Sequence, residues 1–189
     1  MINELYNRIK EQDRFSDVFK PISKEEREKR DREKIEDKLK EGQCTLNPDG
    51  SYSCEGDVNL CDMGLTKIPV RFKEVGGDFY CYYNKLKTLE GAPESVGGNF
   101  SCGYNNLNTL DGAPEKVGGY FSCRDNKLNT LEGAPEKVGG NFYCDNNNLN
   151  TLEGAPKKVG GDFYFSGNPI AFELGIYMIS GSELQKYVK

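Results

Sequence analysis

The 189-residue chain has no histidine, no tryptophan and only three methionines. Without imidazole the chain lacks the side chain that ordinarily titrates near neutral pH, so His-based triads and His-ligated zinc sites are excluded. No apolar run reaches the roughly 20 residues needed to span a bilayer, and the first residues do not form a basic and then apolar leader. We therefore expect a soluble, cytoplasmic protein without membrane contacts.

The charge balance favours protein partners over nucleic acid. A net charge of −5 argues against general affinity for phosphate backbones. Residues 1–42 carry 12 basic and 12 acidic side chains, whereas the remaining residues carry 13 basic and 18 acidic ones. The chain therefore divides near Gly42 into a neutral segment and an acidic body.

Residues 1–42 have the pattern of a helical, charged N-terminal arm. Apolar residues at helical spacing form its expected anchor: Ile2, Leu5, Tyr6, Ile9, Phe15 and Phe19. Ser23 and Glu26 then form a capping box that predicts a second helix, which Gly42 ends.

Only Ile35 and Leu39 are apolar in that second helix. Two interpretations stay open. The helix is either a solvated or partly disordered arm held by ion pairs between successive turns, or a spacer that carries the apolar anchor to a docking site.

A short string, Leu-Glu/Asp-Gly-Ala-Pro, recurs every 21 residues. It occupies Leu89–Pro93, Leu110–Pro114, Leu131–Pro135 and Leu152–Pro156. Between these copies lies Val-Gly-Gly-x-Phe-x-Cys-x-x-Asn-x-Leu-x-x-Leu, and weaker copies at both ends bring the count to six coils. A fixed period of this length predicts a solenoid of stacked coils, because one coil alone cannot bury its apolar residues.

The spacing within a coil predicts its conformation. Phe and Cys at positions i and i+2 point inward from one short strand per coil, so we expect a parallel sheet of about six strands and little helix. Gly-Gly and Gly-Ala-Pro supply the bends. One asparagine per coil is expected to bind backbone groups of the neighbouring coil, and these are Asn84, Asn105, Asn126, Asn147 and Asn168.

The string F-x-C-x-x-N-x-L-x-x-L resembles the L-x-L-x-x-N-x-L core of leucine-rich repeats, whose period is also 20–29 residues. The resemblance covers residues 57–172, and the wording LEGAP…VGG(D/N)FYC is similar to repeat proteins of bacteria and their phages. It implies a leucine-rich-repeat-like recognition scaffold. Phe and Cys replace the usual leucines, which changes the core size, and Met63 stands where the first coil should have Asn, which makes that coil an expected cap.

Four of the seven cysteines, Cys81, Cys102, Cys123 and Cys144, occupy the inward position at the repeat interval. They are expected to form a buried column that acts as small apolar filler. One thiol per coil does not converge on a tetrahedron, so no metal is expected. Cys61 falls on an outward position and is expected to be reachable.

Residues 43–56 are expected to form a capping hairpin. The turn Asn47-Pro48-Asp49-Gly50 would place Cys44 opposite Cys54. A disulfide is then sterically possible, although a reducing cytosol would leave two thiols.

At the other end, residues 173–189 are expected to form a C-terminal cap with a short last helix reaching Val188. Apolar side chains before and within it form an expected lid: Ile170, Phe172, Leu174, Ile176, Tyr177, Met178 and Ile179.

The outward strand positions vary between otherwise similar coils, as a recognition face requires. The candidates on this expected concave face are Asp57, Asn59, Asp78, Tyr80, Tyr82, Asn99, Ser101, Tyr120, Ser122, Arg124, Asn141, Tyr143, Asp145, Asp162, Tyr164 and Ser166. Tyrosine offers rigid contact area with a polar tip, and the excess of aspartate favours a basic or polar surface. The alternative is that these residues only keep the strands soluble.

No unique polar cluster interrupts the repeats, so neither a catalytic site nor a cofactor is expected. Two functions stay open. The first is a non-enzymatic protein-binding scaffold of phage or bacterial type. The second is a structural component of a virion or other large assembly, anchored through residues 1–42.

Overall fold

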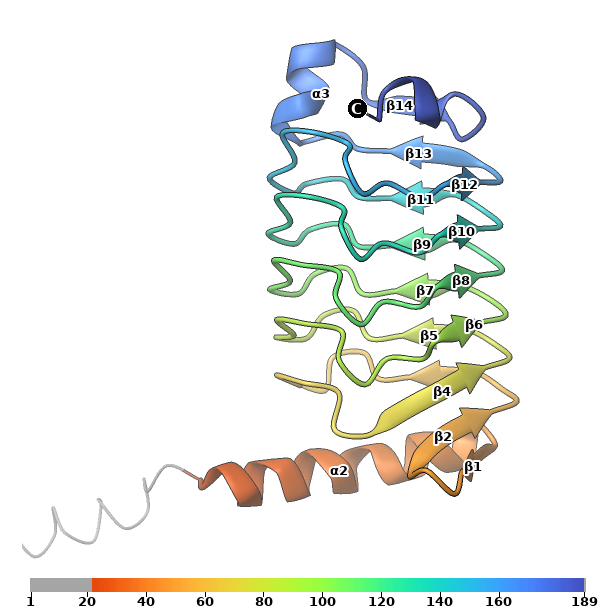
Figure 1. The fold of residues 1–189 in the computed structure, drawn as a ribbon. Coiled ribbons are helices and arrows are strands. Elements are labelled where there is room, and N and C mark those ends of the chain that lie inside the picture. Colours follow the sequence, from red (N-terminus) through yellow and green to blue (C-terminus); the bar gives the residue numbers. More distant parts are fainter. Residues whose placement is uncertain (1–21, 189) are drawn as a thin grey trace, which may run out of the picture.

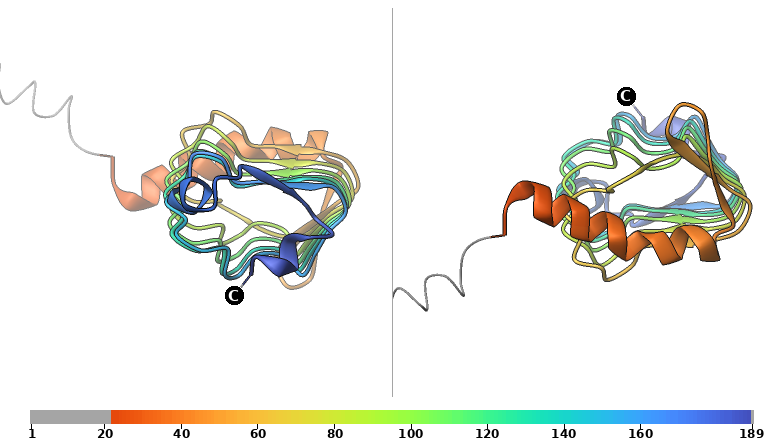
Figure 2. Two further views of the ribbon diagram at one scale, coloured as in Figure 1. Left: turned by 90° about the horizontal axis from the view of Figure 1, so that it is seen from above. Right: turned by 90° about the horizontal axis from the view of Figure 1, so that it is seen from below.

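The computed structural model describes residues 22–188, which form a parallel β-solenoid of about five turns with 21-residue coils and little helix. The coils stack along a nearly straight axis (Figure 1). Viewed along that axis they superimpose as one flattened loop (Figure 2). The predicted period is therefore confirmed, but the stack does not bend to give the concave face that the repeat pattern suggested.

Each coil contributes two strands rather than the single strand predicted. Sheet A has the order β1 (Cys44–Leu46), β2 (Ser51–Cys54), β4 (Arg71–Val75), β6 (Ser95–Val96), β8 (Lys116–Val117), β10 (Lys137–Val138) and β12 (Lys158–Val159). Sheet B has the order β14 (Met178–Ser180), β13 (Asp162–Tyr164), β11 (Phe142–Tyr143), β9 (Phe121–Ser122), β7 (Phe100–Ser101), β5 (Phe79–Tyr80) and β3 (Val58–Asn59). The expected single sheet of about six strands is thus corrected to two seven-stranded sheets.

The additional strands arise because the residues before Gly-Gly are also extended. In these strands valine points into the core while the preceding residue points out, and each valine pairs with the valine 21 residues on, as Val117 does with Val138. Gly-Gly then turns the chain from sheet A to sheet B. Glycine is required here because a Cβ on Gly118 would collide with the carbonyl oxygen of Gly97.

The core between the sheets is built from columns of identical residues. The phenylalanines of sheet B stack with ring centroids 4.9–5.5 Å apart, from Phe79 through Phe163. The cysteine column beside them is fully buried, as predicted, and burial raises the pKa of all four thiols well above the ordinary value. Stacked aromatic rings and small thiols together fill the space between the sheets.

The predicted asparagine contacts are also confirmed. In the third coil, Asn105 Nδ2 donates to the carbonyl oxygens of Cys81 at 3.0 Å, Cys102 at 3.1 Å and Gly103 at 3.2 Å. Its Oδ1 accepts from the backbone N–H of Leu86 at 2.9 Å. The same set of bonds recurs at Asn84, Asn126, Asn147 and Asn168, so each side chain joins its own turn to the preceding coil.

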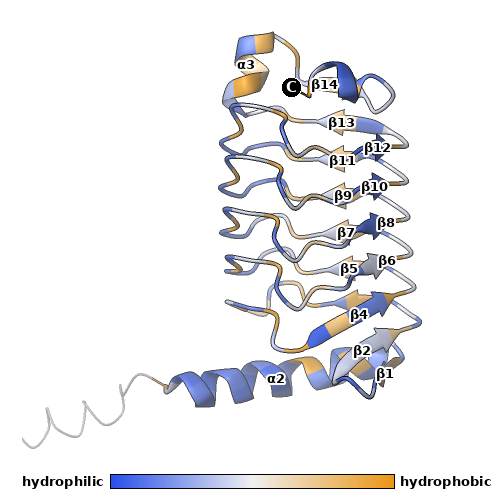
Figure 3. Ribbon diagram, in the orientation of Figure 1, coloured by the Kyte–Doolittle hydropathy of each residue, from blue (hydrophilic) through white to orange (hydrophobic). Residues whose placement is uncertain are grey.

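Helix α2 (Lys24–Glu41) crosses the N-terminal end of the stack (Figures 1 and 2). The predicted capping box of Ser23 and Glu26 starts the helix, and Gly42 follows its last residue. Ile35 and Leu39 are buried against the first coil and the hairpin. Ion pairs such as Lys29 with Glu33 connect successive turns on its exposed side, as expected for a solvated helix. The expectation of a free arm or spacer is corrected for these residues, because Ile35 and Leu39 make α2 part of the N-terminal cap. Figure 3 shows that most of its surface is hydrophilic.

The hairpin has the predicted register. Cys44 pairs with Cys54, and a disulfide joins them. The Asn47 N–H donates to the Ser51 carbonyl at 2.8 Å, which closes the expected turn. The hairpin covers the end of sheet A, because β2 runs parallel to β4.

The C-terminal cap is helical only in part. It contains α3 (Pro169–Leu174), the antiparallel edge strand β14 and one 3₁₀ turn, η1 (Leu184–Lys186). The expected last helix to Val188 is reduced to this 3₁₀ turn, beside which the Glu183 carboxylate pairs with Lys186 Nζ at 2.7 Å. Within the lid Ile179 is buried, whereas Phe172 is 71% exposed.

The cysteine column can be tested by thiol labelling. Without reductant, a maleimide should label Cys61 slowly in the native protein and spare Cys81, Cys102, Cys123 and Cys144, because burial holds those thiols protonated and covered. Denaturant should expose all five free cysteines. Mass spectrometry of the Cys61→Ser variant provides the control, and rapid native labelling of that variant would contradict the inward placement.

The asparagine contacts can be tested by substitution in one coil. Asn105→Ala should lower the free energy of unfolding by about 3 kcal/mol, because buried carbonyl and N–H groups lose their partner. The matched control is Asn106→Ala, since the Asn106 side chain forms no hydrogen bond within residues 22–188. Equal denaturation midpoints for the two variants would show that the contacts are dispensable.

Candidate functional site

The outer side of sheet B carries most of the predicted recognition residues, together with aromatic residues that were not predicted. We call this surface the tyrosine face and define it by Tyr80, Tyr82, Tyr83, Tyr104, Arg124, Tyr120, Tyr143 and Tyr164. The sheet places these residues there because they alternate with the buried Phe and Cys positions, or directly follow them in the turn.

Ring contacts divide the tyrosine face into two groups. In the first, centroid distances are 6.0 Å from Tyr80 to Tyr82, 5.5 Å from Tyr82 to Tyr83 and 4.5 Å from Tyr83 to Tyr104. The Arg124 guanidinium lies 5.4 Å from the centroid of the Tyr104 ring and extends this group by a cation–π contact.

The second group lies nearer the C-terminal end of the stack. Tyr120 and Tyr143 meet edge-on at 6.0 Å, and Tyr143 stacks on Tyr164 at 4.9 Å. Met178 of β14 pairs with Tyr164 and is 47% exposed, so it continues this column to the end of the sheet. In both groups of the tyrosine face, contacts with neighbouring rings fix the position of each tyrosine ring.

Tyr83 and Tyr104 were missed because they follow the strand instead of alternating within it. Both have positive φ, 55° and 52°, and they precede the buried asparagine of their coils. The corresponding residues of other coils are Asp62, Asp125, Asn146 and Gly167, which have the same left-handed backbone. Asp, Asn and Gly adopt that conformation readily, but tyrosine does so at a cost of about 1–2 kcal/mol.

A predicted column of polar residues has a structural role. Asp57 Oδ1 accepts from the Asp78 N–H at 2.8 Å, and Asp78 Oδ1 from the Asn99 N–H at 2.6 Å. Asn99 and Asn141 make the same bond to the next coil. These side chains are therefore partly used to hold the coils together, which explains why Asp or Asn recurs after Gly-Gly.

The remaining carboxylate oxygens of this column orient the tyrosines. The Tyr80 hydroxyl donates to Asp78 Oδ2 at 2.6 Å, and Tyr164 donates to Asp162 Oδ2 at 3.4 Å. Burial, with help from this bond, raises the pKa of Tyr80 above its usual range. Burial opposes ionisation of Asp78, but hydrogen bonds from Asn99 and Tyr80 bring its pKa below the ordinary value.

Two residues that were predicted to contact a partner are covered by their neighbours in the structure. Ser101 is 9% exposed and Ser122 is 5% exposed, because they lie between Tyr80 and Tyr143 in one cross-strand column. Larger neighbours cover such small side chains. Their prediction as contact residues is therefore corrected.

The other predicted positions lie at the surface. Asn59, Arg124 and Ser166 are exposed, whereas Asp145 is half-buried and burial raises its pKa above the ordinary value. Cys61 is half-buried rather than freely reachable, and burial likewise raises its pKa. The predicted anchor residues Ile2, Leu5, Tyr6, Ile9, Phe15 and Phe19 lie outside the described residues.

The outer side of sheet B and the turn that follows each strand carry six aspartates and one basic residue, Arg124, within residues 22–188. The aspartates are Asp57, Asp62, Asp78, Asp125, Asp145 and Asp162.

Within residues 22–188, no cluster of acidic or cysteine side chains is placed to hold a metal ion. No helix in that range is long and apolar enough to cross a bilayer.

Comparison with family models, curated proteins and solved structures finds no match to this chain.

The division between core and face can be tested with two neighbouring aromatic residues. Phe142→Ala should lower the free energy of unfolding by about 3–5 kcal/mol, because it opens a cavity in the phenylalanine stack. Tyr143→Ala should cost about 1 kcal/mol, because it removes surface ring contacts and the hydrogen bond from Asn141 Nδ2 to the Tyr143 hydroxyl. Chemical denaturation measures both, and a greater loss for Tyr143→Ala would reverse the assigned faces.

Proposed function

We propose that this protein is a non-enzymatic binding scaffold whose tyrosine face engages a basic or polar surface of another protein. Tyrosine is enriched in protein interfaces because it contributes large contact area at low conformational cost. The surrounding aspartates provide an acidic rim that favours partners of opposite charge. The resemblance of the repeat motif to leucine-rich repeats supports the same class of function.

One observation carries this proposal. Tyr83 and Tyr104 occupy left-handed positions where other coils of the same chain use Asp, Asn or Gly. Tyr83 is also 54% exposed, so core packing does not explain its ring. A residue that strains the backbone without filling the core fits a role in recognition, since strained residues concentrate at functional sites.

The acidic groups of the face support a binding role better than a catalytic one. Asp57 and Asp78 accept hydrogen bonds from the backbone of the next coil, and Asp78 also fixes Tyr80. These carboxylates are therefore engaged in orienting the surface. The alternative role as a virion or assembly component depends on an anchor in residues 1–42, and no contact of the described residues favours it over the scaffold.

Cross-linking and substitution at Tyr83 and Tyr104 distinguish their contact with a partner from the backbone strain that they cause. A benzoylphenylalanine cross-linker at position 104 should capture a specific protein in the native source cells, whereas the same group at Lys137 on sheet A should not. With that protein purified, Tyr83→Asn and Tyr104→Asn together should weaken binding by about 1–4 kcal/mol, as loss of interface anchors does.

The same double variant should keep or raise the free energy of unfolding, because asparagine tolerates the left-handed backbone. Asn146→Tyr is the reverse control and should destabilise the protein without improving binding. Unchanged affinity of the double variant for the captured protein would refute the proposal, as would equal cross-linking from both positions.

A further inference from the structure

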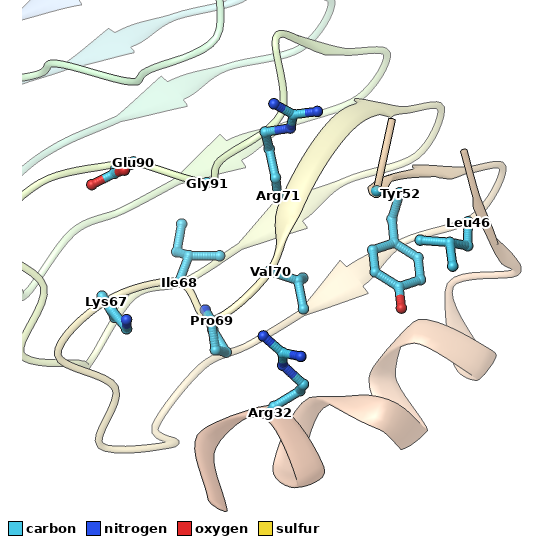
Figure 4. Close-up of a pocket in the computed structure, with 11 residues that line it drawn as sticks. Arg32, Leu46, Tyr52, Lys67, Ile68, Pro69, Val70, Arg71, Glu90 and Gly91 are labelled. Carbon is cyan, nitrogen blue, oxygen red and sulfur yellow. The ribbon is translucent and has the colours of Figure 1, made fainter. Parts of the chain in front are cut away.

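A pocket of about 500 Å³ lies where α2, the β1–β2 hairpin and the first coil meet (Figure 4). Its apolar wall consists of Leu46, Ile68, Pro69, Val70 and the ring of Tyr52. None of the lining residues belongs to sheet B, so the pocket is separate from the tyrosine face. Its lining combines this apolar wall with cationic side chains.

Three cationic side chains line this pocket. Lys67 Nζ pairs with Glu28 Oε1 at 2.7 Å, and Arg71 Nη2 pairs with Asp49 Oδ2 at 2.7 Å. Arg32 makes no ion pair with any residue in the described part of the chain.

The lining contains one acidic residue, Glu90, which lies on the opposite side of the pocket from Arg32 in Figure 4. Both hydrogen bonds of Arg71 come from Nη2, which leaves the other edge of its guanidinium available. Among residues 22–188, the Arg32 guanidinium thus has no carboxylate within ion-pair distance, because Glu28, whose pKa is lowered by Lys67 and also by Arg32, is bound to Lys67. The Arg71 guanidinium is only partly used.

The repeat itself does not require these cations. The residues that correspond to Lys67 in the later coils are Thr88, Thr109, Thr130 and Thr151. Those that correspond to Arg71 are Ala92, Ala113, Ala134 and Ala155. Ion pairs to the hairpin and to α2 explain Lys67 and Arg71 as parts of the cap, but they leave Arg32 unexplained.

We propose that this pocket binds an amphiphilic carboxylate, meaning a carboxylate joined to an aromatic or aliphatic group, with Arg32 as its main partner. The planar guanidinium of arginine matches a carboxylate with two parallel hydrogen bonds. The wall formed by Tyr52, Pro69 and Val70 accepts the apolar part, which a simple inorganic anion would leave uncovered. The ligand is either a free small molecule or the C-terminal residue of a partner's peptide.

Nuclear magnetic resonance of the full chain tests this proposal with N-acetylphenylalanine as the probe. We expect saturable shifts at Tyr52, Val70 and the Arg32 side chain with a Kd in the millimolar range, which is usual for a ligand of about 15 heavy atoms. N-acetylphenylalanine amide and acetate, which each lack one half of the recognised group, should bind at least about tenfold more weakly.

Arg32→Gln should weaken binding of the probe by about tenfold or more while leaving the spectrum of the repeats unchanged. Arg30→Gln on the same helix is the matched control, because Arg30 does not line the pocket, and it should bind like the wild type. A short peptide ending in phenylalanine, compared with its C-terminal amide, distinguishes the peptide source from the free ligand. Equal binding of acid and amide, unchanged binding by Arg32→Gln, or no shifts at the pocket would overturn the proposal.

Discussion

The contact of each buried asparagine with the coil before it is the constraint on which the rest of this structure depends. Asn105 donates to three carbonyl oxygens and accepts from one N–H, and thereby ties its own turn to the backbone of the preceding coil. The contact forms only if neighbouring coils are stacked one strand spacing apart and are offset by 21 residues in the sequence. That requirement places Phe above Phe and Cys above Cys, so the core becomes columns of like residues.

The same turn explains why Tyr83 and Tyr104 interrupt the regular pattern of the tyrosine face. To bring the asparagine inward, the residue before it must adopt a left-handed backbone, which projects its side chain beside the outer surface of sheet B. Most coils use Asp, Asn or Gly there, but two use tyrosine. The left-handed backbone is thus formed at a higher conformational free energy in the two coils that carry Tyr83 and Tyr104, whose ring centroids lie 4.5 Å apart. Local strain and exposed aromatic area coincide at one place on the surface.

The inward half of each coil could be predicted from the sequence because it repeats. The burial of the Phe and Cys columns, the role of the asparagines, the hairpin register and the capping box of α2 all follow from spacing. The second strand of each coil could not be predicted, since two residues before Gly-Gly carry no alternation to detect. The burial of Ser101 and Ser122 was missed for another reason, because it depends on the size of their neighbours in adjacent coils. The packing of α2 depends on only two apolar side chains, Ile35 and Leu39, which also fit a solvated helix.

The ends of the solenoid follow different rules from its middle. Within the stack, every inward residue must match its copies above and below, so chemical variety is confined to outward positions and turns. The first coil has a neighbouring coil on one side only, so its inward residues have fewer copies to match. It has Ile-Pro-Val-Arg-Phe where the later coils have Leu-Glu-Gly-Ala-Pro. The hairpin and the polar helix α2 cover that end through a few buried residues and through ion pairs such as Lys67 with Glu28. Because these elements do not share the repeat geometry, they meet the first coil imperfectly and enclose a pocket. Unrepeated chemistry in a solenoid is therefore expected first where a cap joins the stack, and here Arg32 lies at that junction.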